Sequence, residues 1–268
     1  MASIQDALRG LWIDRGVVVF RGLDGGEETH LLLSRVFGEL EDHAMTRDRA
    51  DRHPELLDIF YDGSKGEIYE VDGKLLGAWL PWHIDLIYID RMNHGGILRA
   101  IELPRGGGGQ TGFIDRINAY DRLPDELKAR IEGLNVVYRA HFDASIQQFK
   151  SNRARTIHPL VYRQPNTGRK VLNVSPWFAE SSEGAENEEG DAILKAAIEH
   201  SIRPDLAYFH DWQVEDMVLW DNWRMMHSAR GVAADDRRVM KRTTIAGDYE
   251  LGRVEGGVPF PDALRISV

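Results

Sequence analysis

A histidine and an acidic residue stand two positions apart in the segment PWHIDLIY, residues 81–88. In a β-strand, His83 and Asp85 would project from the same face, as two ligands of one metal ion require. The spacing alone is weak evidence, because 10 histidines and 43 acidic residues in 268 positions give about 1.6 His-x-acid triplets by chance. The chain contains three such triplets, the other two beginning at His53 and His141. The surrounding sequence must therefore decide between them.

A further histidine lies far downstream, in the segment LWDNWRMMHSAR at residues 219–230. The chain has no cysteine, so a metal ion must be held by histidine and carboxylate side chains. Two histidines and one carboxylate on one side of a metal leave three adjacent coordination positions open, which is the geometry of non-haem iron(II) oxygenases. We assign His83, Asp85 and His227 as this set, because neither of the other triplets has a matching partner downstream.

Two arginines follow this histidine in the segment DRRVMKRTTIAGD, residues 236–248. Their even spacing in a strand would point the guanidinium groups of Arg238 and Arg242 to one side. Each guanidinium is a planar, always-charged fork that matches a carboxylate in two hydrogen bonds. The pair therefore favours an anionic ligand, whereas Arg237 and Lys241 are expected on a solvated face.

The elements that position these residues are predicted to be mostly short strands. Helical spacing of apolar residues predicts helices over residues 4–16, 27–38, 190–202 and, with a break at Pro124, 116–134. Strand-like runs occupy residues 16–22, 55–63, 95–104, 111–115, 169–175, 217–222 and 237–248. Strands outnumber helices and do not alternate regularly with them. This pattern favours a mainly β fold with flanking helices, a sandwich or barrel, over a doubly wound sheet.

Three glycine-rich or acidic segments connect these elements. Residues 62–81 include four glycines and an Asp72-Gly73 turn, which predicts a short hairpin that acts as a mobile lid or, alternatively, an ordinary surface hairpin. The glycines at 106–109 do not form a phosphate-binding loop, because no G-K-[ST] follows them. The stretch SSEGAENEEG at 181–190 is predicted to be a solvated acidic loop.

Composition narrows the class of protein. A chain of 268 residues with 43% hydrophobic content can bury a full core, and we favour one domain over residues 1–268. A formal net charge of −10 argues against nucleic-acid and membrane partners and favours small-molecule partners. The N-terminus lacks a signal-peptide pattern, so we expect a cytoplasmic protein. The oligomeric state is left open, a homo-oligomer included.

The motifs taken together resemble a known family. WHID, GGQTGFID, HPLVYRQPNTGRKVLNVS, LWDNWRMMHSAR and DRRVMKRTTIAGD are similar, in this order, to motifs of the taurine dioxygenase and 2,4-dichlorophenoxyacetate dioxygenase family of iron(II)- and 2-oxoglutarate-dependent oxygenases. The resemblance implies a double-stranded β-helix, a jelly-roll of two facing sheets with helices outside. It also implies Fe(II) as cofactor, with 2-oxoglutarate and O2 as cosubstrates. The implied reaction releases succinate and CO2 while a substrate carbon is hydroxylated, and hydroxylation beside oxygen, nitrogen or sulfur would cleave the substrate.

The resemblance also assigns binding roles. Arg238 matches the family arginine that pairs with the distal carboxylate of 2-oxoglutarate, Thr111 the threonine that hydrogen-bonds the same group, and Arg242 an arginine that reaches the substrate's own anion. We therefore expect a carboxylate or sulfonate substrate with an apolar or aromatic body. Trp79 stands where taurine-specific members have a polar residue, which argues against taurine itself. The expected substrate contacts are His43, Trp79, Phe142, Trp177, Phe178 and Arg242.

An alternative of another class is a catalytically silent protein that binds a metal or small molecule on the same fold. The intact set of two histidines and a carboxylate, together with both arginines, favours the enzyme. A residue without a carboxylate at position 85 would have indicated a halogenase, and Asp85 argues against that reaction.

Overall fold

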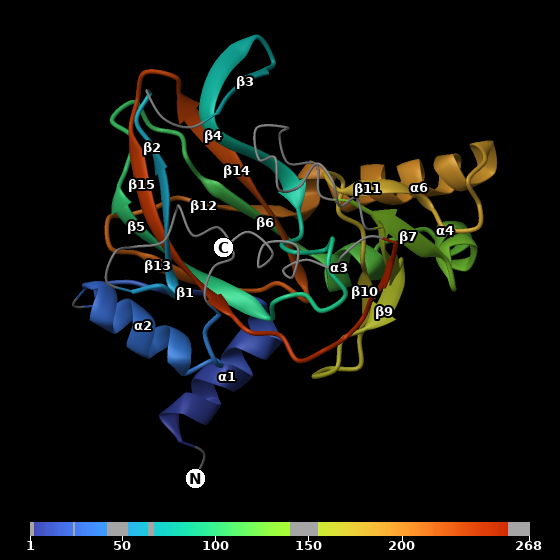
Figure 1. Cartoon of the computed structure of the whole chain (residues 1–268), viewed down its shortest axis with the longest axis horizontal. Coiled ribbons are helices and arrows are strands. Elements are labelled where there is room, and N and C mark those ends of the chain that lie inside the picture. The colour runs from blue at the N-terminus through green and yellow to red at the C-terminus, as the bar shows by residue number, and fades with distance from the viewer. Residues whose placement is uncertain (1–2, 24, 42–52, 64–66, 140–154, 257–268) are drawn as a thin grey trace. The chain divides into compact units, whose positions relative to one another are not determined.

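The structure is a computed structural model that describes residues 3–23, 25–41, 53–63, 67–139 and 155–256 (Figure 1). The chain divides into two compact units. Unit 1 comprises Met1–Pro81, Asn93–Phe113 and Tyr208–Gly247, and unit 2 comprises Trp82–Met92, Ile114–Ala207 and Asp248–Val268. Each unit draws on several separate segments of the chain, and the single domain over residues 1–268 stays a prediction.

Unit 1 contains a five-stranded antiparallel sheet, here called sheet A. Its strand order is β1-β13-β5-β15-β2. The strands are β1 (Val17–Phe20), β13 (Met217–Asp221), β5 (Gly95–Glu102), β15 (Arg238–Ile245) and β2 (Leu56–Tyr61). All five correspond to strands predicted from the sequence, which are thereby confirmed.

A second five-stranded sheet, sheet B, has the order β12-β6-β14-β4-β3. Its strands are β12 (Ala207–His210), β6 (Thr111–Asp115), β14 (Met225–Ala233), β4 (Lys74–His83) and β3 (Ile68–Val71). Only β6 and the hairpin of β3 and β4 were anticipated. Asp72 and Gly73 at the hairpin tip both have positive φ, 50° and 73°, as a tight two-residue hairpin turn requires. The hairpin is confirmed, and its movement as a lid stays a prediction.

The central strand β5 separates two apolar layers of unit 1. Successive side chains of a strand point to opposite faces, so Leu98 and Ala100 pack with Phe113 and Trp220 in one buried cluster, whereas Ile97 packs in another. The second cluster includes Trp12 of helix α1 (Ile4–Arg15). Helix α1 and helix α2 (Glu27–Arg35), both drawn in blue in Figure 1, lie against sheet A. Complete burial of each large apolar side chain contributes about 1.5–3 kcal/mol to folding.

Local signals set the ends of α1. The Ser3 side chain accepts from the Asp6 backbone N–H and the Asp6 carboxylate accepts from that of Ser3, a capping box. The helix ends at Gly16, whose φ of 76° is left-handed, a conformation that glycine adopts without steric penalty. The predicted helix and the strand that follows it are both confirmed.

Unit 2 contains a four-stranded sheet of order β11-β7-β8-β16 and a hairpin of β9 and β10. Its strands are β7 (Asn135–Tyr138), β8 (Arg155–Pro159), β9 (Val161–Arg163), β10 (Lys170–Leu172), β11 (Ala179–Ser182) and β16 (Arg253–Glu255). Its helices are α3 (Arg116–Asp121), α4 (Asp125–Ile131), α6 (Glu188–Ser201) and the short 3-10 helix η2 (Pro204–Leu206). The predicted helix interruption at Pro124 is confirmed.

The acidic segment 181–190 is a loop only in part. Its first two residues end β11, and its last three open α6. The Asn187 side chain caps the helix by accepting from the Gly190 N–H, and Glu188 and Glu189 lie in the first turn, where negative charge is stabilised by the helix dipole. The prediction of a loop across the whole segment was therefore wrong.

The mainly β architecture with flanking helices is confirmed. In the part of the chain that the structure describes, no helix combines the length and apolar character needed to cross a membrane.

Candidate active site

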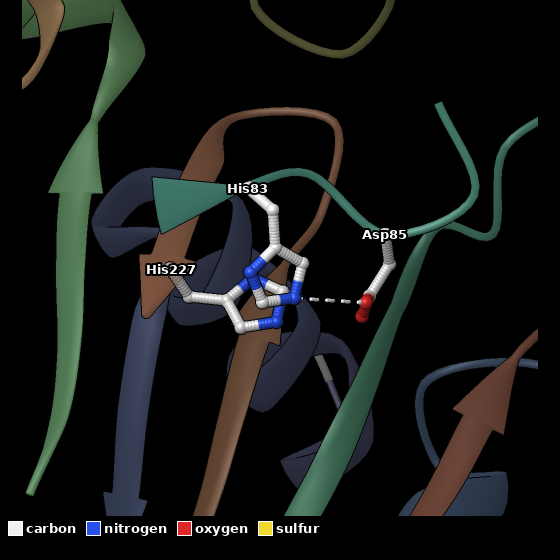
Figure 2. Close-up of side chains that lie close together, drawn as sticks. All are labelled: His83, Asp85 and His227. Atoms are coloured by element: carbon white, nitrogen blue, oxygen red, sulfur yellow. Dashed lines mark ion pairs between the residues drawn. The ribbon is translucent and has the colours of Figure 1, made fainter. Parts of the chain in front are cut away.

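Two histidines and one aspartate come together in the structure (Figure 2). β4 ends at His83, Asp85 follows two residues later, and β14 carries His227. One side-chain ligand atom from each residue lies within 4.8 Å of the other two. Both histidines are buried, at 5% and 9% exposure. The structure thus gathers the three residues that the sequence assigned to one metal.

The local conformation of this motif differs from the sequence prediction. The strand predicted over residues 81–88 ends at His83, and Asp85 begins a turn in which Leu86 has a left-handed φ of 53°. Strand periodicity was therefore the wrong reason for placing the two side chains together. The turn nevertheless brings Asp85 Oδ1 to 3.6 Å from His83 Nε2, the ion pair drawn dashed in Figure 2.

Buried side chains of unit 2 hold the backbone of this turn. Ser175 Oγ accepts from the Ile84 N–H at 3.1 Å, and Thr156 Oγ1 donates to the Tyr88 carbonyl at 2.6 Å. His158 Nε2 donates to the Ile89 carbonyl at 2.8 Å. Unsatisfied buried backbone groups are costly, so these bonds favour one conformation of the turn.

An aromatic wall lies beside His83. The rings of Trp177 and Phe178 are stacked with centroids 4.7 Å apart, and each meets the His83 ring edge-on, at 5.4 and 6.4 Å. Phe178 is 3% exposed, whereas Trp177 is half-buried. The structure thus places two of the predicted substrate contacts beside a predicted metal ligand.

Aromatic rings of unit 1 also surround His227. The ring centroids of Trp220 and Phe113 lie 5.3 and 6.4 Å from that of His227. The guanidinium carbon of Arg242 lies over the Trp220 ring, 5.1 Å from its centroid. A cation this close to an indole face is electrostatically stabilised by the ring.

Arg238 lies on the same face of β15 as Arg242, as the even spacing predicted. Val239 and Lys241 lie on the opposite face, where Lys241 forms an ion pair. Arg238 is only 3% exposed, and its Nε and Nη2 have no hydrogen-bond acceptor among the described residues. Burial lowers the pKa of the Arg238 guanidinium to about 10. The group is still charged at pH 7, so the fold contains a buried cation that requires an anion.

The residues present fit both iron(II) and 2-oxoglutarate. Two imidazoles and a carboxylate form a donor set that suits iron(II), and their ligand atoms lie near enough to one another to meet at one ion. For 2-oxoglutarate, the unsatisfied Arg238 guanidinium offers a fork for the distal carboxylate. Thr111, which is 4% exposed, offers a hydroxyl. These binding roles stay predictions.

The other predicted substrate contacts are less informative. His43 and Phe142 lie outside the described residues. Trp79 is half-buried on β4, in the predicted lid, and its ring centroid is 5.4 Å from that of Tyr69. Its contact with substrate stays a prediction.

Sequence reasoning missed two residues that adjoin the predicted cosubstrate groups. Trp212 donates its indole N–H to Thr111 Oγ1 at 3.2 Å. Gly109 has a φ of 70°, and a Cβ atom there would lie 3.2 Å from Cδ and Nε of Arg238. The glycine run at 106–109 was the available signal, because a glycine at positive φ often marks a close approach.

Comparisons with known proteins identify the family of the chain. The family model described as "Taurine catabolism dioxygenase TauD, TfdA family" matches residues 2–244. The (S)-phenoxypropionate/alpha-ketoglutarate-dioxygenase of Sphingobium herbicidovorans is 30% identical over 92% of this chain and 89% of its own. Pentalenolactone F synthase of Streptomyces avermitilis is 27% identical over 87% of this chain and 82% of its own.

Solved structures confirm the fold. The crystal structure of a taurine dioxygenase from Burkholderia xenovorans superimposes with a TM-score of 0.79 and 27% sequence identity, covering 100% of this chain and 91% of that one. The predicted jelly-roll is thereby confirmed, as are the 2-oxoglutarate-dependent dioxygenase class and its cofactors. The chain belongs to the taurine catabolism dioxygenase TauD, TfdA family.

Proposed function

We propose that the chain oxidises a small organic anion, a carboxylate or sulfonate with an apolar or aromatic body, and releases succinate and CO2 from 2-oxoglutarate. The observation that carries the proposal is the convergence of His83, Asp85 and His227. Two imidazoles and one carboxylate form the donor set that would hold iron(II) in an oxygenase.

The chain's own residues would divide the work as follows. His83, Asp85 and His227 would hold iron(II), which together with 2-oxoglutarate and O2 supplies the oxidising chemistry. Arg238 would hold the distal carboxylate of the cosubstrate. The aromatic wall of Trp177 and Phe178 would position the apolar body of the substrate and exclude water beside His83.

The proposed charge of the substrate rests on Arg242. Arg242 lies four positions after Arg238 along the strand, an advance of about 13 Å, so the two guanidinium groups can serve different anions. Arg242 packs on the Trp220 ring, whose centroid is 5.3 Å from that of His227. The phenoxypropionate named for the Sphingobium relative, a carboxylate with an aromatic body, supports this substrate class. Hydroxylation of the carbon beside its ether oxygen would cleave such a molecule.

The test is substrate-dependent succinate formation by the purified chain supplied with iron(II) and 2-oxoglutarate. Aryloxyalkanoates and alkylsulfonates would be compared with the neutral amides of the same acids. We expect turnover with one of the anions, weaker or no turnover with its amide, and none in His83→Ala, Asp85→Ala or His227→Ala. Full activity in any of these variants would contradict the metal assignment, and a better neutral substrate would contradict the substrate class.

A matched pair of arginine variants separates substrate binding from cosubstrate binding. Arg242→Ala should raise the apparent KM of the anionic substrate by roughly 10- to 100-fold, the effect of a lost charge-assisted hydrogen bond, with little change for 2-oxoglutarate. Arg237→Ala is the control, since Arg237 is half-exposed and paired with Glu102. Loss of 2-oxoglutarate binding in Arg242→Ala would show that the roles of the two arginines were assigned wrongly.

We further propose that residues 1–268 act as one catalytic domain, with the segment 62–81 closing over the site as a lid. The family match runs without interruption from residue 2 to 244, which supports one domain. Leu75 and Ile68 in the β3–β4 hairpin are 59% and 48% exposed, which leaves apolar surface for a closing segment to bury. A cytoplasmic location and the lack of nucleic-acid or membrane partners stay predictions.

A further inference from the structure

Thr111 receives a hydrogen bond from a residue that can only donate. The Trp212 indole N–H lies 3.2 Å from Thr111 Oγ1, and an indole nitrogen has no acceptor capacity. The Thr111 oxygen must therefore be the acceptor in this pair. Its own hydroxyl proton is left for another group, because the bond from Trp212 is the one hydrogen bond that the Thr111 hydroxyl makes with the described residues.

The Trp212 ring is packed tightly enough to keep its N–H directed at the Thr111 oxygen. It is 8% exposed and packs in the same buried cluster as Phe113 and Met240. Met240 lies between Arg238 and Arg242 on β15. The Trp212 ring also meets the His210 ring edge-on, with centroids 4.5 Å apart.

An ionic cluster fixes the loop that carries Trp212. Asp216, 1% exposed, accepts from Arg21 Nε and Nη2 at 2.7 and 2.6 Å, from the Gln213 N–H at 2.9 Å and from His210 Nε2 at 3.1 Å. Burial alone would raise the pKa of Asp216, but these hydrogen bonds lower it. The ionised Asp216 carboxylate therefore connects the residues that precede and follow Trp212 in the chain.

The Arg238 side chain lies close to Gly109, in the segment that leads into the Thr111 strand. Gly109, two residues before Thr111, leaves space for the Arg238 side chain, because a Cβ there would lie 3.2 Å from Arg238 Cδ and Nε. An unsatisfied guanidinium and an uncommitted hydroxyl proton are the two donors that a single carboxylate accepts well.

We propose that Trp212 is a positioning residue that directs the Thr111 hydroxyl proton toward the distal carboxylate of bound 2-oxoglutarate. This inference rests on the proposed function. Without the indole N–H, the Thr111 hydroxyl would rotate among several hydrogen-bonding directions, and part of the binding free energy would be lost in ordering it. Trp212 itself needs no contact with the cosubstrate.

The test is a double-mutant cycle on 2-oxoglutarate binding, measured by calorimetry with the manganese(II)-loaded protein so that no turnover occurs. Trp212→Phe removes the N–H and keeps an aromatic ring. We expect about 3- to 10-fold weaker binding in Trp212→Phe, which removes a neutral hydrogen bond, and about 10-fold or weaker binding in Thr111→Val, which removes a charge-assisted one. The double variant should bind within about 2-fold of Thr111→Val, because Trp212 acts only through Thr111.

Trp12→Phe is the matched control. Trp12 is a buried tryptophan, 2% exposed, whose indole N–H has no partner in the described part of the chain. This variant should leave 2-oxoglutarate binding unchanged. An unchanged affinity in Trp212→Phe, or fully multiplicative effects in the double variant, would overturn the inference.

A spectroscopic readout covers the case in which Trp212→Phe fails to fold. In Thr111→Val, the indole N–H resonance that moves most identifies Trp212, and in the wild type this resonance should shift when 2-oxoglutarate is added. No shift on saturation would overturn the inference. Failure of the wild type to bind 2-oxoglutarate at all would instead overturn the proposed function.

Discussion

Two buried arginines on neighbouring strands of sheet A differ in whether the chain supplies an acceptor for them. Arg99 on β5 is 6% exposed, and two of its nitrogens donate to the Glu215 carboxylate. Arg238 on β15 is 3% exposed, yet its Nε and Nη2 find no acceptor in the described ranges. The chain supplies an anion for Arg99, and among the described residues it supplies none for Arg238.

The two arginines differ in what they are expected to do. Arg99 is paired within the chain and should stabilise the fold, whereas Arg238 should bind a ligand. A buried charge without a partner costs several kcal/mol, and the depressed pKa of Arg238 reflects that burial. Because folding gains nothing from such a group, we predict that Arg238 serves to bind an anion. Buried groups whose partners lie in the chain should accordingly affect stability alone.

His30 is a buried group whose hydrogen-bond partner lies in the chain, so it should affect stability and not ligand binding. Its Nε2 donates to the Ile97 carbonyl on β5 at 3.0 Å, and burial lowers the His30 pKa to about 4. The unfolded chain binds this proton near pH 6.5, whereas the folded chain does not until about pH 4. The free energy of unfolding should therefore fall as pH drops from 6.5 to 4, by up to about 3 kcal/mol for this residue.

Urea unfolding at pH 7 and pH 5 measures this effect. His30→Gln should reduce the loss of stability between the two pH values without abolishing it, because His158 has a similarly lowered pKa of about 4. Binding of 2-oxoglutarate at pH 7 should be unchanged. An unaltered pH dependence in His30→Gln would contradict the assignment.

Leucine substitutions of the two arginines should change stability in opposite directions. In the absence of ligand, Arg238→Leu should raise the free energy of unfolding by about 1–2 kcal/mol, because an unpaired buried charge is removed. Arg99→Leu should lower it by about 1 kcal/mol, a modest effect because the Glu215 side chain is 37% exposed. Denaturant unfolding checks both, and a similar loss in both variants would remove the distinction between the two sites.

Lysine substitution at the same two positions sharpens the distinction for binding. Arg238→Lys should weaken 2-oxoglutarate about 10-fold, since an ammonium cannot form two parallel hydrogen bonds to one carboxylate. Arg99→Lys keeps the charge facing Glu215 and should leave the affinity unchanged. Calorimetric titration gives both values, and equal affinities in the two variants would mean that Arg238 is not the carboxylate anchor.

Apolar runs in the sequence predicted all strands of sheet A, and the residue types predicted the reaction class. The sequence did not predict every element that positions the site residues. β14 was missed because four consecutive buried residues, Met225 to Ser228, show no strand alternation. The Asp85 turn was missed because it is held by Ser175, Thr156 and His158, which lie far away in the chain. Hydrogen bonds between distant segments leave no local pattern.

The site residues could be predicted to the extent that their chemistry is local. The spacing of Arg238 and Arg242 fixes their common face once β15 forms. The unsatisfied state of Arg238 and the Trp212–Thr111 hydrogen bond depend on three-dimensional packing. Neither could be deduced from residue spacing.

We propose that Arg238 is the anchor for the distal carboxylate of 2-oxoglutarate. The most direct test compares the binding of 2-oxoglutarate and 2-oxovalerate, in which a methyl group replaces that carboxylate, to the manganese(II)-loaded chain. The wild type should prefer 2-oxoglutarate by about 100-fold, the effect of one bidentate charge-assisted contact, and Arg238→Leu should bind the two acids about equally. Equal binding by the wild type, or an undiminished preference in Arg238→Leu, would contradict the account.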